Sequence, residues 1–77
     1  MPRRYTAREV VRVLRRLGWV VDRQHGSHLV LLRAGYRGHV SVPDHGSAVI
    51  IQKTFNSILR QAALTRQGFE AMAEEVL

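Results

Sequence analysis

Cysteine does not occur in the sequence, which excludes disulfide bonds and zinc sites built on thiolates. Long apolar runs are also missing, and none approaches the roughly 20 residues that are needed to span a bilayer. The first residues, Met1 to Tyr5, lack the apolar stretch of a secretory signal peptide. These absences predict a cytoplasmic protein that does not enter a membrane and has no covalent crosslinks.

Negative charge is scarce as well: six Asp and Glu residues stand against twelve Lys and Arg, and the formal net charge is +6. All of the cationic residues except Lys53 are arginine, which binds phosphate through two parallel hydrogen bonds. The charge balance therefore predicts a polyanionic partner, either nucleic acid or an acidic protein. An anionic membrane surface fits less well, because no stretch combines a basic face with exposed Trp, Phe and Leu.

The chain has 77 residues, which is enough for one domain at most. Its composition, 45% hydrophobic and 23% charged, is that of a folded globular protein rather than a disordered one. We therefore expect residues 1–77 to form a single domain. Its stability should be modest, because a chain this short buries only about 60% of its unfolded surface.

A first helix is predicted from Thr6 to Gly18. Thr6 and Glu9 have the spacing of a capping box, and Gly18 is a typical helix stop. Apolar residues recur every three or four positions and form one stripe: Val10, Val13, Leu14 and Leu17. Four arginines fall on the opposite side: Arg8, Arg12, Arg15 and Arg16. This arginine face could lie along a nucleic-acid backbone, or it could simply be solvated.

Strand-forming residues follow the helix from Trp19 onward. The sequence predicts three antiparallel strands, over about 19–23, 28–33 and 38–43, joined by turns at 25–27 and 34–37 and ended by Pro43. Trp19 could stack on a base, but a tryptophan just after a helix-ending glycine more often belongs to the core.

Helical spacing returns in the last third of the chain. A second helix is predicted to lie across one face of the sheet through an apolar stripe: Ile51, Phe55, Ile58, Leu59 and Ala62. Thr65 is then the predicted N-cap of a short terminal helix that carries Phe69, Met72 and Val76. The predicted class is α+β, in the order helix, three-stranded antiparallel sheet, helix, short C-terminal helix.

The tripeptide Gly26-Ser27-His28 lies between two apolar runs, where a tight turn would place His28 at the start of a strand at the sheet edge. A histidine in such a place is available for chemistry. If the next hairpin closes around residues 34–37, residues whose numbers sum to about 71 face one another. His28 then lies opposite Pro43 and close to Asp44 and His45.

Three segments together resemble the HicA toxin family, also described as YcfA-like: residues 23–28 (Arg-Gln-His-Gly-Ser-His), 42–46 (Val-Pro-Asp-His-Gly) and 54–62 (Thr-Phe-Asn-Ser-Ile-Leu-Arg-Gln-Ala). The likeness extends from about Thr6 to Met72. It departs from the family pattern at 51–53, Ile-Gln-Lys in place of Lys-Pro-Gly, and at 63–65, Ala-Leu-Thr in place of Gly-Leu-Ser.

This resemblance implies a fold similar to the double-stranded RNA-binding domain and the activity of an mRNA-cleaving toxin of a type II toxin-antitoxin system. It also implies a partner, an antitoxin of the HicB type that covers the active surface of the toxin. In the family the histidine of the Gly-Ser-His turn is the catalytic residue, and that position here is His28.

RNA carries its own nucleophile, the ribose 2'-hydroxyl, so its cleavage requires a general base and no metal or other cofactor. Histidine suits this role because its reference pKa is about 6.5, and we assign His28 as the base. His45 is the first candidate for the acid and His25 the second, whereas His39 is expected to be a mid-strand surface residue. The histidines do not have the spacing of metal ligands on one element.

Further residues are candidate RNA contacts because of their charge or their place beside the turn: Arg8, Arg12, Arg15, Arg16, Arg23, Ser27, Arg33 and Lys53.

Two other functions are alternatives to RNA cleavage. The first is a non-catalytic module that binds double-stranded RNA by its shape. The second is an interaction domain whose basic surface docks an acidic protein.

Overall fold

The structure, a computed structural model, describes residues 3–77. Its elements follow one another in the order α1 (Ala7–Arg16), β1 (Val20–His25), β2 (His28–Leu32), β3 (Val40–Pro43), α2 (Gln52–Gln61) and α3 (Arg66–Val76). The predicted α+β class and the predicted order of elements are both confirmed. None of the helices in residues 3–77 is long and apolar enough to cross a membrane.

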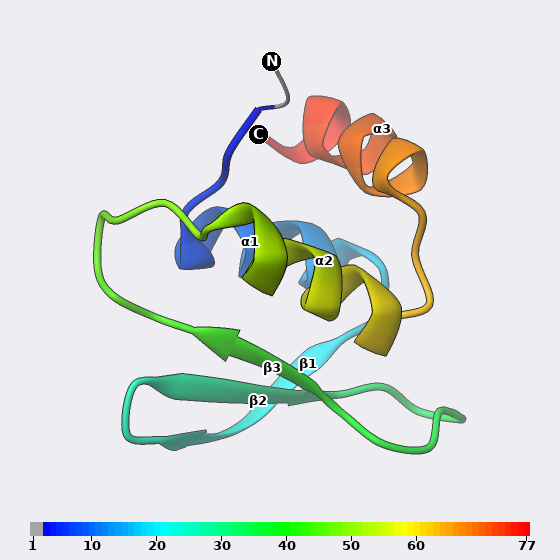
Figure 1. The fold of residues 1–77 in the computed structure, drawn as a ribbon. Helices are drawn as coiled ribbons and strands as arrows, with labels where there is room; N and C mark the ends of the chain where they lie inside the picture. The colour runs from blue at the N-terminus through cyan, green and yellow to red at the C-terminus, as the bar shows by residue number, and fades with distance from the viewer. Residues whose placement is uncertain (1–2) are drawn as a thin grey trace.

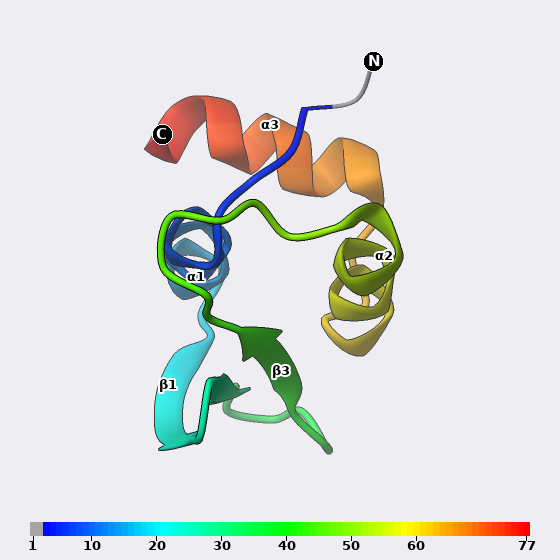
Figure 2. The same cartoon turned by 60° about the vertical axis from the view of Figure 1, so that its left-hand side comes forward.

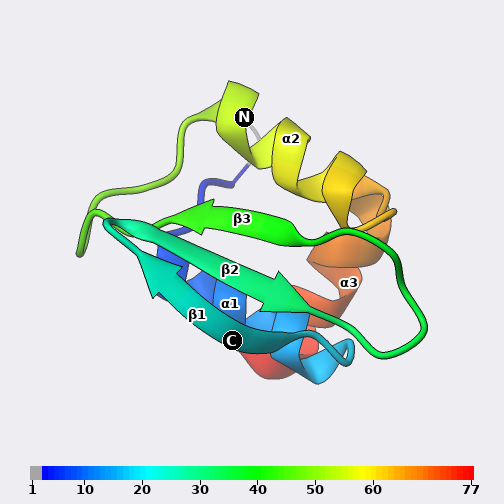
Figure 3. The ribbon, with the colours of Figure 1, turned by 90° about the horizontal axis from the view of Figure 1, so that it is seen from below.

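The elements form three layers, which Figures 1 and 2 show from two directions. The sheet is one outer layer, α1 and α2 lie side by side on one of its faces, and α3 lies across the far side of these two helices. Helix α2 packs against β3, while α1 contacts both β3 and α3. No helix of residues 3–77 lies on the other face of the sheet (Figure 3).

Helix α1 begins and ends as the sequence predicts. The Thr6 hydroxyl accepts a hydrogen bond from the Glu9 amide at 3.2 Å, and the Glu9 carboxylate accepts one from the Thr6 amide at 2.9 Å, which completes the capping box. At the other end Gly18 has a φ of +101°, and the amides of Gly18 and Trp19 donate back to Arg15 and Leu14. This Schellman arrangement requires the left-handed conformation that glycine adopts without strain.

The sheet has the strand order β1-β2-β3, and both pairs are antiparallel. Its strands are one or two residues shorter at some ends than predicted, so His39 precedes β3 and the expectation that it lies mid-strand is wrong. A register shift between Val21 and Arg23 makes Asp22 the extra residue of a β-bulge. Nothing in the sequence pattern predicted this bulge.

One hydrophobic core fills the space between the sheet and the helices. Trp19 is 1% exposed, which confirms that it belongs to this core rather than to a base-stacking surface. From α2, Phe55, Ile58 and Leu59 are buried in the core as predicted. The predicted stripe is wrong at Ile51, which precedes the first turn of α2 and is 60% exposed.

Helix α3 completes the core from the side opposite the sheet. The Thr65 hydroxyl accepts a hydrogen bond from the Gly68 amide at 2.9 Å, so the predicted N-cap is confirmed. Phe69 is fully buried and lies edge-on to the rings of Tyr5 and Phe55, with both centroids 5.0 Å away. The aromatic cluster of Tyr5, Phe55 and Phe69 therefore joins the N-terminal segment to α2 and α3.

The two faces of the sheet differ in what they contact. Successive side chains of a strand point to opposite faces, and Leu29 and Leu31 of β2 pack with the core beneath the helices. His28 and Val30 therefore lie on the face without helices, and Val30 does not belong to the core cluster. His28 is thus placed on the open face at the end of β2 that adjoins the Gly26-Ser27 turn.

Candidate active site

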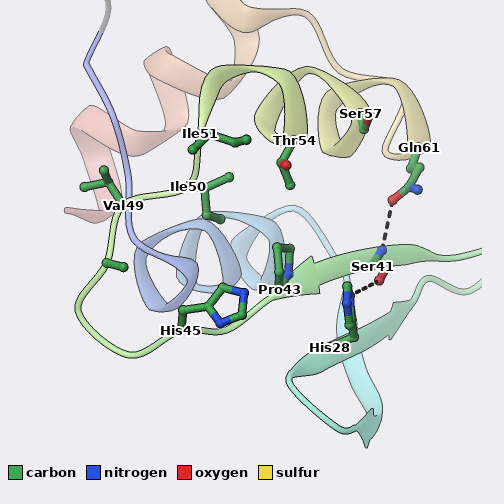
Figure 4. Close-up of a pocket in the computed structure, with 11 residues that line it drawn as sticks. His28, Ser41, Pro43, His45, Val49, Ile50, Ile51, Thr54, Ser57 and Gln61 are labelled. Atoms are coloured by element: carbon green, nitrogen blue, oxygen red, sulfur yellow. Dashed lines mark hydrogen bonds between the residues drawn. The ribbon is translucent and has the colours of Figure 1, made fainter.

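A groove of about 450 Å³ runs between the β3 side of the sheet and α2 (Figure 4). Its lining comes from β2, β3, the loop that follows β3, and α2. The lining residues are His28, Ser41, Pro43, His45, Ala48, Val49, Ile50, Ile51, Thr54, Ser57 and Gln61. The two histidines that the sequence singles out as base and acid thus share one groove, although they come from different elements.

The turn before β2 determines where His28 lies. Gly26 has a φ of +62°, a conformation that a residue with a Cβ adopts only with strain. Beyond its chain neighbours, no atom of residues 3–77 lies within 4 Å of where that Cβ would be. The two-residue turn brings His25 opposite His28 in the β1-β2 hairpin. On the other side His28 pairs with Pro43, which confirms the register predicted from the sequence.

Within the described part of the chain, the His28 ring makes one hydrogen bond. Its Nδ1 atom lies 3.2 Å from the hydroxyl oxygen of Ser41, the diagonal neighbour of His28 on β3. No other described residue forms a hydrogen bond with the ring, so the Nε2 atom has no protein partner in residues 3–77. Because the side chain is exposed, Nε2 is available to a ligand in the groove.

Two hydrogen bonds fix the loop that carries His45. One joins the loop to the Gly26-Ser27 turn, and the other lies within the loop. The Asp44 amide donates to the Ser27 carbonyl at 2.6 Å, so the loop starts directly beside the Gly26-Ser27 turn. The Asp44 carboxylate then accepts from the Gly46 amide at 3.0 Å, which is the Asx turn typical of such loops. His45 lies between the two attached residues, is exposed and faces the groove.

The far end of the same loop is attached to the N-terminal segment. Thr6 and Val49 form an isolated β-bridge, and the Ile50 amide donates to the Tyr5 carbonyl at 2.7 Å. Ile50 is 6% exposed and belongs to the core. The loop from β3 to α2 is therefore held at both of its ends.

Apart from the two histidines, no ionisable side chain of the described residues lines the groove. Val49 and Ile51 are 45% and 60% exposed and give one end of it an apolar surface, while Thr54 and Ser57 add hydroxyl groups from α2. Ile51 belongs to the first departure from the family pattern, and this departure lies directly at the groove. The groove therefore suits an uncharged or aromatic part of a ligand more than an isolated anion.

The arginines of α1 do not line the groove. All four are exposed, and they lie opposite the buried stripe of the helix: Arg8, Arg12, Arg15 and Arg16. The Arg12 guanidinium donates to the Val76 carbonyl at 3.1 Å, so it also contacts the end of α3. The four arginines therefore form one exposed surface of α1, as predicted, and this surface is separate from the groove with the two histidines.

The other predicted RNA contacts lie around the sheet and α2 rather than in the groove lining. Arg23 pairs with Val30 in the register of β1 and is bonded to Asp22 at 3.1 Å. Arg33 lies beyond the other end of β2, roughly 17 Å from His28 along an extended strand, and stacks over the Tyr36 ring at 4.7 Å. Lys53 is exposed in the first turn of α2, and Ser27 lies in the turn itself.

Ser41 and Gln61 are two polar groove residues that were not predicted as site residues. Ser41 could have been found, because the predicted register already places it diagonally across from His28. Gln61 gave no such signal in the sequence. Its side-chain oxygen accepts a hydrogen bond from the Ser41 amide at 2.9 Å, and this contact depends on how α2 lies beside β3.

Residues 3–77 contain no group of three or more His, Cys, Asp or Glu side chains that could bind one metal ion together.

Comparison with known proteins identifies the family of the chain. No curated protein matches it in a sequence search. The family model described as the HicA toxin of bacterial toxin-antitoxin systems matches residues 7–64, which comprise α1, the whole sheet, the groove and α2. Because this match spans well over half of the chain, the protein belongs to the HicA toxin family.

Proposed function

We propose that the protein is a metal-independent endoribonuclease that cleaves mRNA, with His28 as the general base. In this reaction Nε2 of His28 takes the proton of a ribose 2'-hydroxyl, and the 2'-oxygen attacks the adjacent phosphorus. The bond from phosphorus to the 5'-oxygen of the next nucleotide breaks, and that oxygen receives a proton from the acid. The products are a 2',3'-cyclic phosphate and a 5'-hydroxyl.

The observation that carries this proposal is that the two imidazoles line one groove. Attack and departure take place on opposite sides of the phosphorus, so a base and an acid must reach the phosphate from two directions. His28 extends from β2 and His45 from the loop after β3, which supports His45 as the acid. General acid-base catalysis of this kind typically contributes 10² to 10⁴ in rate.

The cations serve binding rather than chemistry in this proposal. The groove holds the nucleotides around the cleaved bond, while the RNA backbone on either side contacts arginines outside the groove. Among the predicted contacts, Arg23 on β1 and Ser27 in the turn belong to the same hairpin as His28. The arginine face of α1 would bind RNA farther along the backbone.

As a HicA toxin, the protein belongs to a toxin-antitoxin system and has an antitoxin partner. We propose that this partner is of the HicB type and that it covers the groove, where Val49 and Ile51 offer exposed apolar surface beside the histidines. The proposed place of action is the cytoplasm, where mRNA is found.

The test is cleavage of a long unstructured RNA by the purified protein, with and without a chelator. His28→Ala should abolish cleavage and leave the fold intact, because the side chain is exposed. His39→Ala is the matched control, since His39 is exposed and lies outside the groove. Undiminished cleavage by His28→Ala would refute the proposal, and loss of cleavage with chelator would refute its metal independence.

The separation of the α1 arginines from the groove favours a second candidate, a module that binds double-stranded RNA without cutting it. Such a module would bind in a salt-dependent manner, with log affinity falling by roughly 0.7 to 0.9 per phosphate contact for each decade of salt. It would yield no cut product at any protein concentration. The same RNA incubation therefore separates the two candidates.

A further inference from the structure

The contact between His28 and Ser41 bears on which ring nitrogen of His28 carries the proton. A neutral imidazole has one N–H donor and one acceptor nitrogen, and the partner of one nitrogen sets the state of the other. For Nε2 to act as a base, the proton must be on Nδ1. A freely exposed histidine side chain favours the opposite tautomer, with the proton on Nε2, so an exposed His28 needs a partner that reverses this preference.

We propose that Ser41 is a positioning residue for His28: its hydroxyl oxygen accepts a hydrogen bond from Nδ1–H, keeps the Nε2 lone pair free and fixes the ring toward the groove. The contact is 3.2 Å long and is the only hydrogen bond of the ring within residues 3–77 (Figure 4). The proposal deepens the proposed function and rests on it for its catalytic consequence. The tautomer itself is a property of the free protein.

Ser41 is well placed for this role because its own position is fixed. It lies in β3, pairs with Val30 in the register of the sheet, and its side chain is on the same open face as His28. Its amide donates to the Gln61 side chain at 2.9 Å, which holds this edge of the sheet against the end of α2. A hydroxyl on a strand fixed from both sides can orient a ring more tightly than one on a loop.

The other polar groups of the groove do not have this contact. The Ser57 hydroxyl accepts from the Arg60 guanidinium at 3.1 Å, and no hydrogen bond joins His45 to the ring of His28 in the described part of the chain. Ser41 is therefore the residue of the described chain that is placed to influence the His28 tautomer, by accepting from Nδ1–H rather than donating to Nδ1. It does not touch the reacting atoms, so its removal should weaken catalysis without abolishing it.

The first measurement is the nitrogen NMR spectrum of the full chain labelled with ¹⁵N in its histidines, without RNA, at a pH where imidazole is neutral. In the wild type, His28 should carry its proton on Nδ1. In Ser41→Ala the spectrum should shift toward the Nε2–H tautomer, and Ser41→Thr should keep the wild-type state, because it retains the hydroxyl and suits a strand. Ser47→Ala is the matched control, an exposed loop serine outside the groove.

The second measurement is single-turnover cleavage of RNA across a range of pH. Ser41→Ala should lower the rate constant roughly ten- to a hundredfold, the loss expected when a catalytic group is misplaced, while RNA affinity, which the arginines outside the groove supply in this proposal, falls far less. Ser41→Thr should restore most of the rate. A wild-type His28 with its proton on Nε2, or an Ser41→Ala variant with unchanged tautomer and rate, would overturn the proposal. Failure of the proposed function is recognised separately, by cleavage that survives in His28→Ala.

Discussion

The Gln61 side chain accepts a hydrogen bond from the Ser41 backbone amide at 2.9 Å and so joins the last turn of α2 to the outer edge of β3. Strand β3 is the edge of the sheet on this side, and this amide would otherwise face solvent. Gln61→Ala should lower the free energy of unfolding by about 0.5 kcal/mol, the low end for a hydrogen bond, because the contact is exposed. The more sensitive measurement is amide hydrogen exchange, which should become faster at Ser41. Gln67→Ala on α3 is the control, and equal exchange at Ser41 in both variants would contradict the interpretation.

Phe69 connects α3, which lies outside the matched family region, to the core of the toxin fold. Because its ring is fully buried against Tyr5 and Phe55, Phe69→Ala should cost about 3–5 kcal/mol in the free energy of unfolding. That is a large share of the stability expected of so short a domain. Urea denaturation measures it. Glu75→Ala, on the exposed side of the same helix, should stay within about 0.5 kcal/mol, and a loss at Phe69 as small as that would show that α3 is not part of the cooperative unit.

Replacing the N-cap threonine by alanine in α1 and in α3 compares the stability that a capping box provides with that of a single cap. Thr6→Ala removes the acceptor for the Glu9 amide and disturbs the reciprocal bond that the Thr6 amide donates to the Glu9 carboxylate, whereas Thr65→Ala removes only the acceptor for the Gly68 amide. We expect losses of unfolding free energy within about 0.5–2 kcal/mol at both sites, with the larger loss at Thr6. Chemical denaturation of the two variants provides the comparison, and a larger loss at Thr65 would mean that the reciprocal bond adds nothing.

Deprotonation of Tyr5 should lower the free energy of unfolding at alkaline pH. Burial raises the pKa of Tyr5 above its ordinary value of 10.0; Arg3 and Arg66 oppose this effect, and Glu70 and Glu9 reinforce it. The folded state therefore holds the phenolic proton more tightly than the unfolded state. The contribution of Tyr5 is fully present below pH 10 and is lost as the pH rises through the raised pKa.

The measurement for Tyr5 is urea denaturation from pH 8 to 11. Tyr5→Phe should flatten the decline above pH 10, because it keeps the buried ring and removes the proton. Tyr36→Phe should leave the decline in place, since Tyr36 is 44% exposed. A wild-type curve that stays level up to pH 11 would show that the Tyr5 proton is not linked to folding.

Much of the fold follows from local signals in the sequence. The capping box at Thr6, the stop at Gly18 and the N-cap at Thr65 all act within a few residues, and each has the predicted hydrogen bonds. The register that places His28 opposite Pro43 was also predictable, because it depends only on where one hairpin closes. The prediction that Ile51 belongs to the buried stripe of α2 is wrong because periodicity alone does not reveal where a helix begins.

The geometry of the candidate site was less predictable. The contact of Gln61 with Ser41 depends on the distance and angle between α2 and β3, which tertiary packing sets and no sequence spacing encodes. The positions of the arginines relative to the groove depend on the same packing: the helical pattern groups those of α1 on one face but does not say which way that face points. The bulge at Asp22 carries no glycine or other local marker.

That bulge has a consequence for how the protein behaves at high concentration. Helix α2 protects one border of the sheet, but the other border, β1, is exposed along its whole length and offers a free backbone to any strand that approaches. An extra residue bends and twists such a strand, and the adjacent charges of Asp22 and Arg23 disfavour a flat, dry contact. Deletion of Asp22 would leave a regular and straighter border, and with it a greater tendency of the toxin to form sheet-to-sheet aggregates.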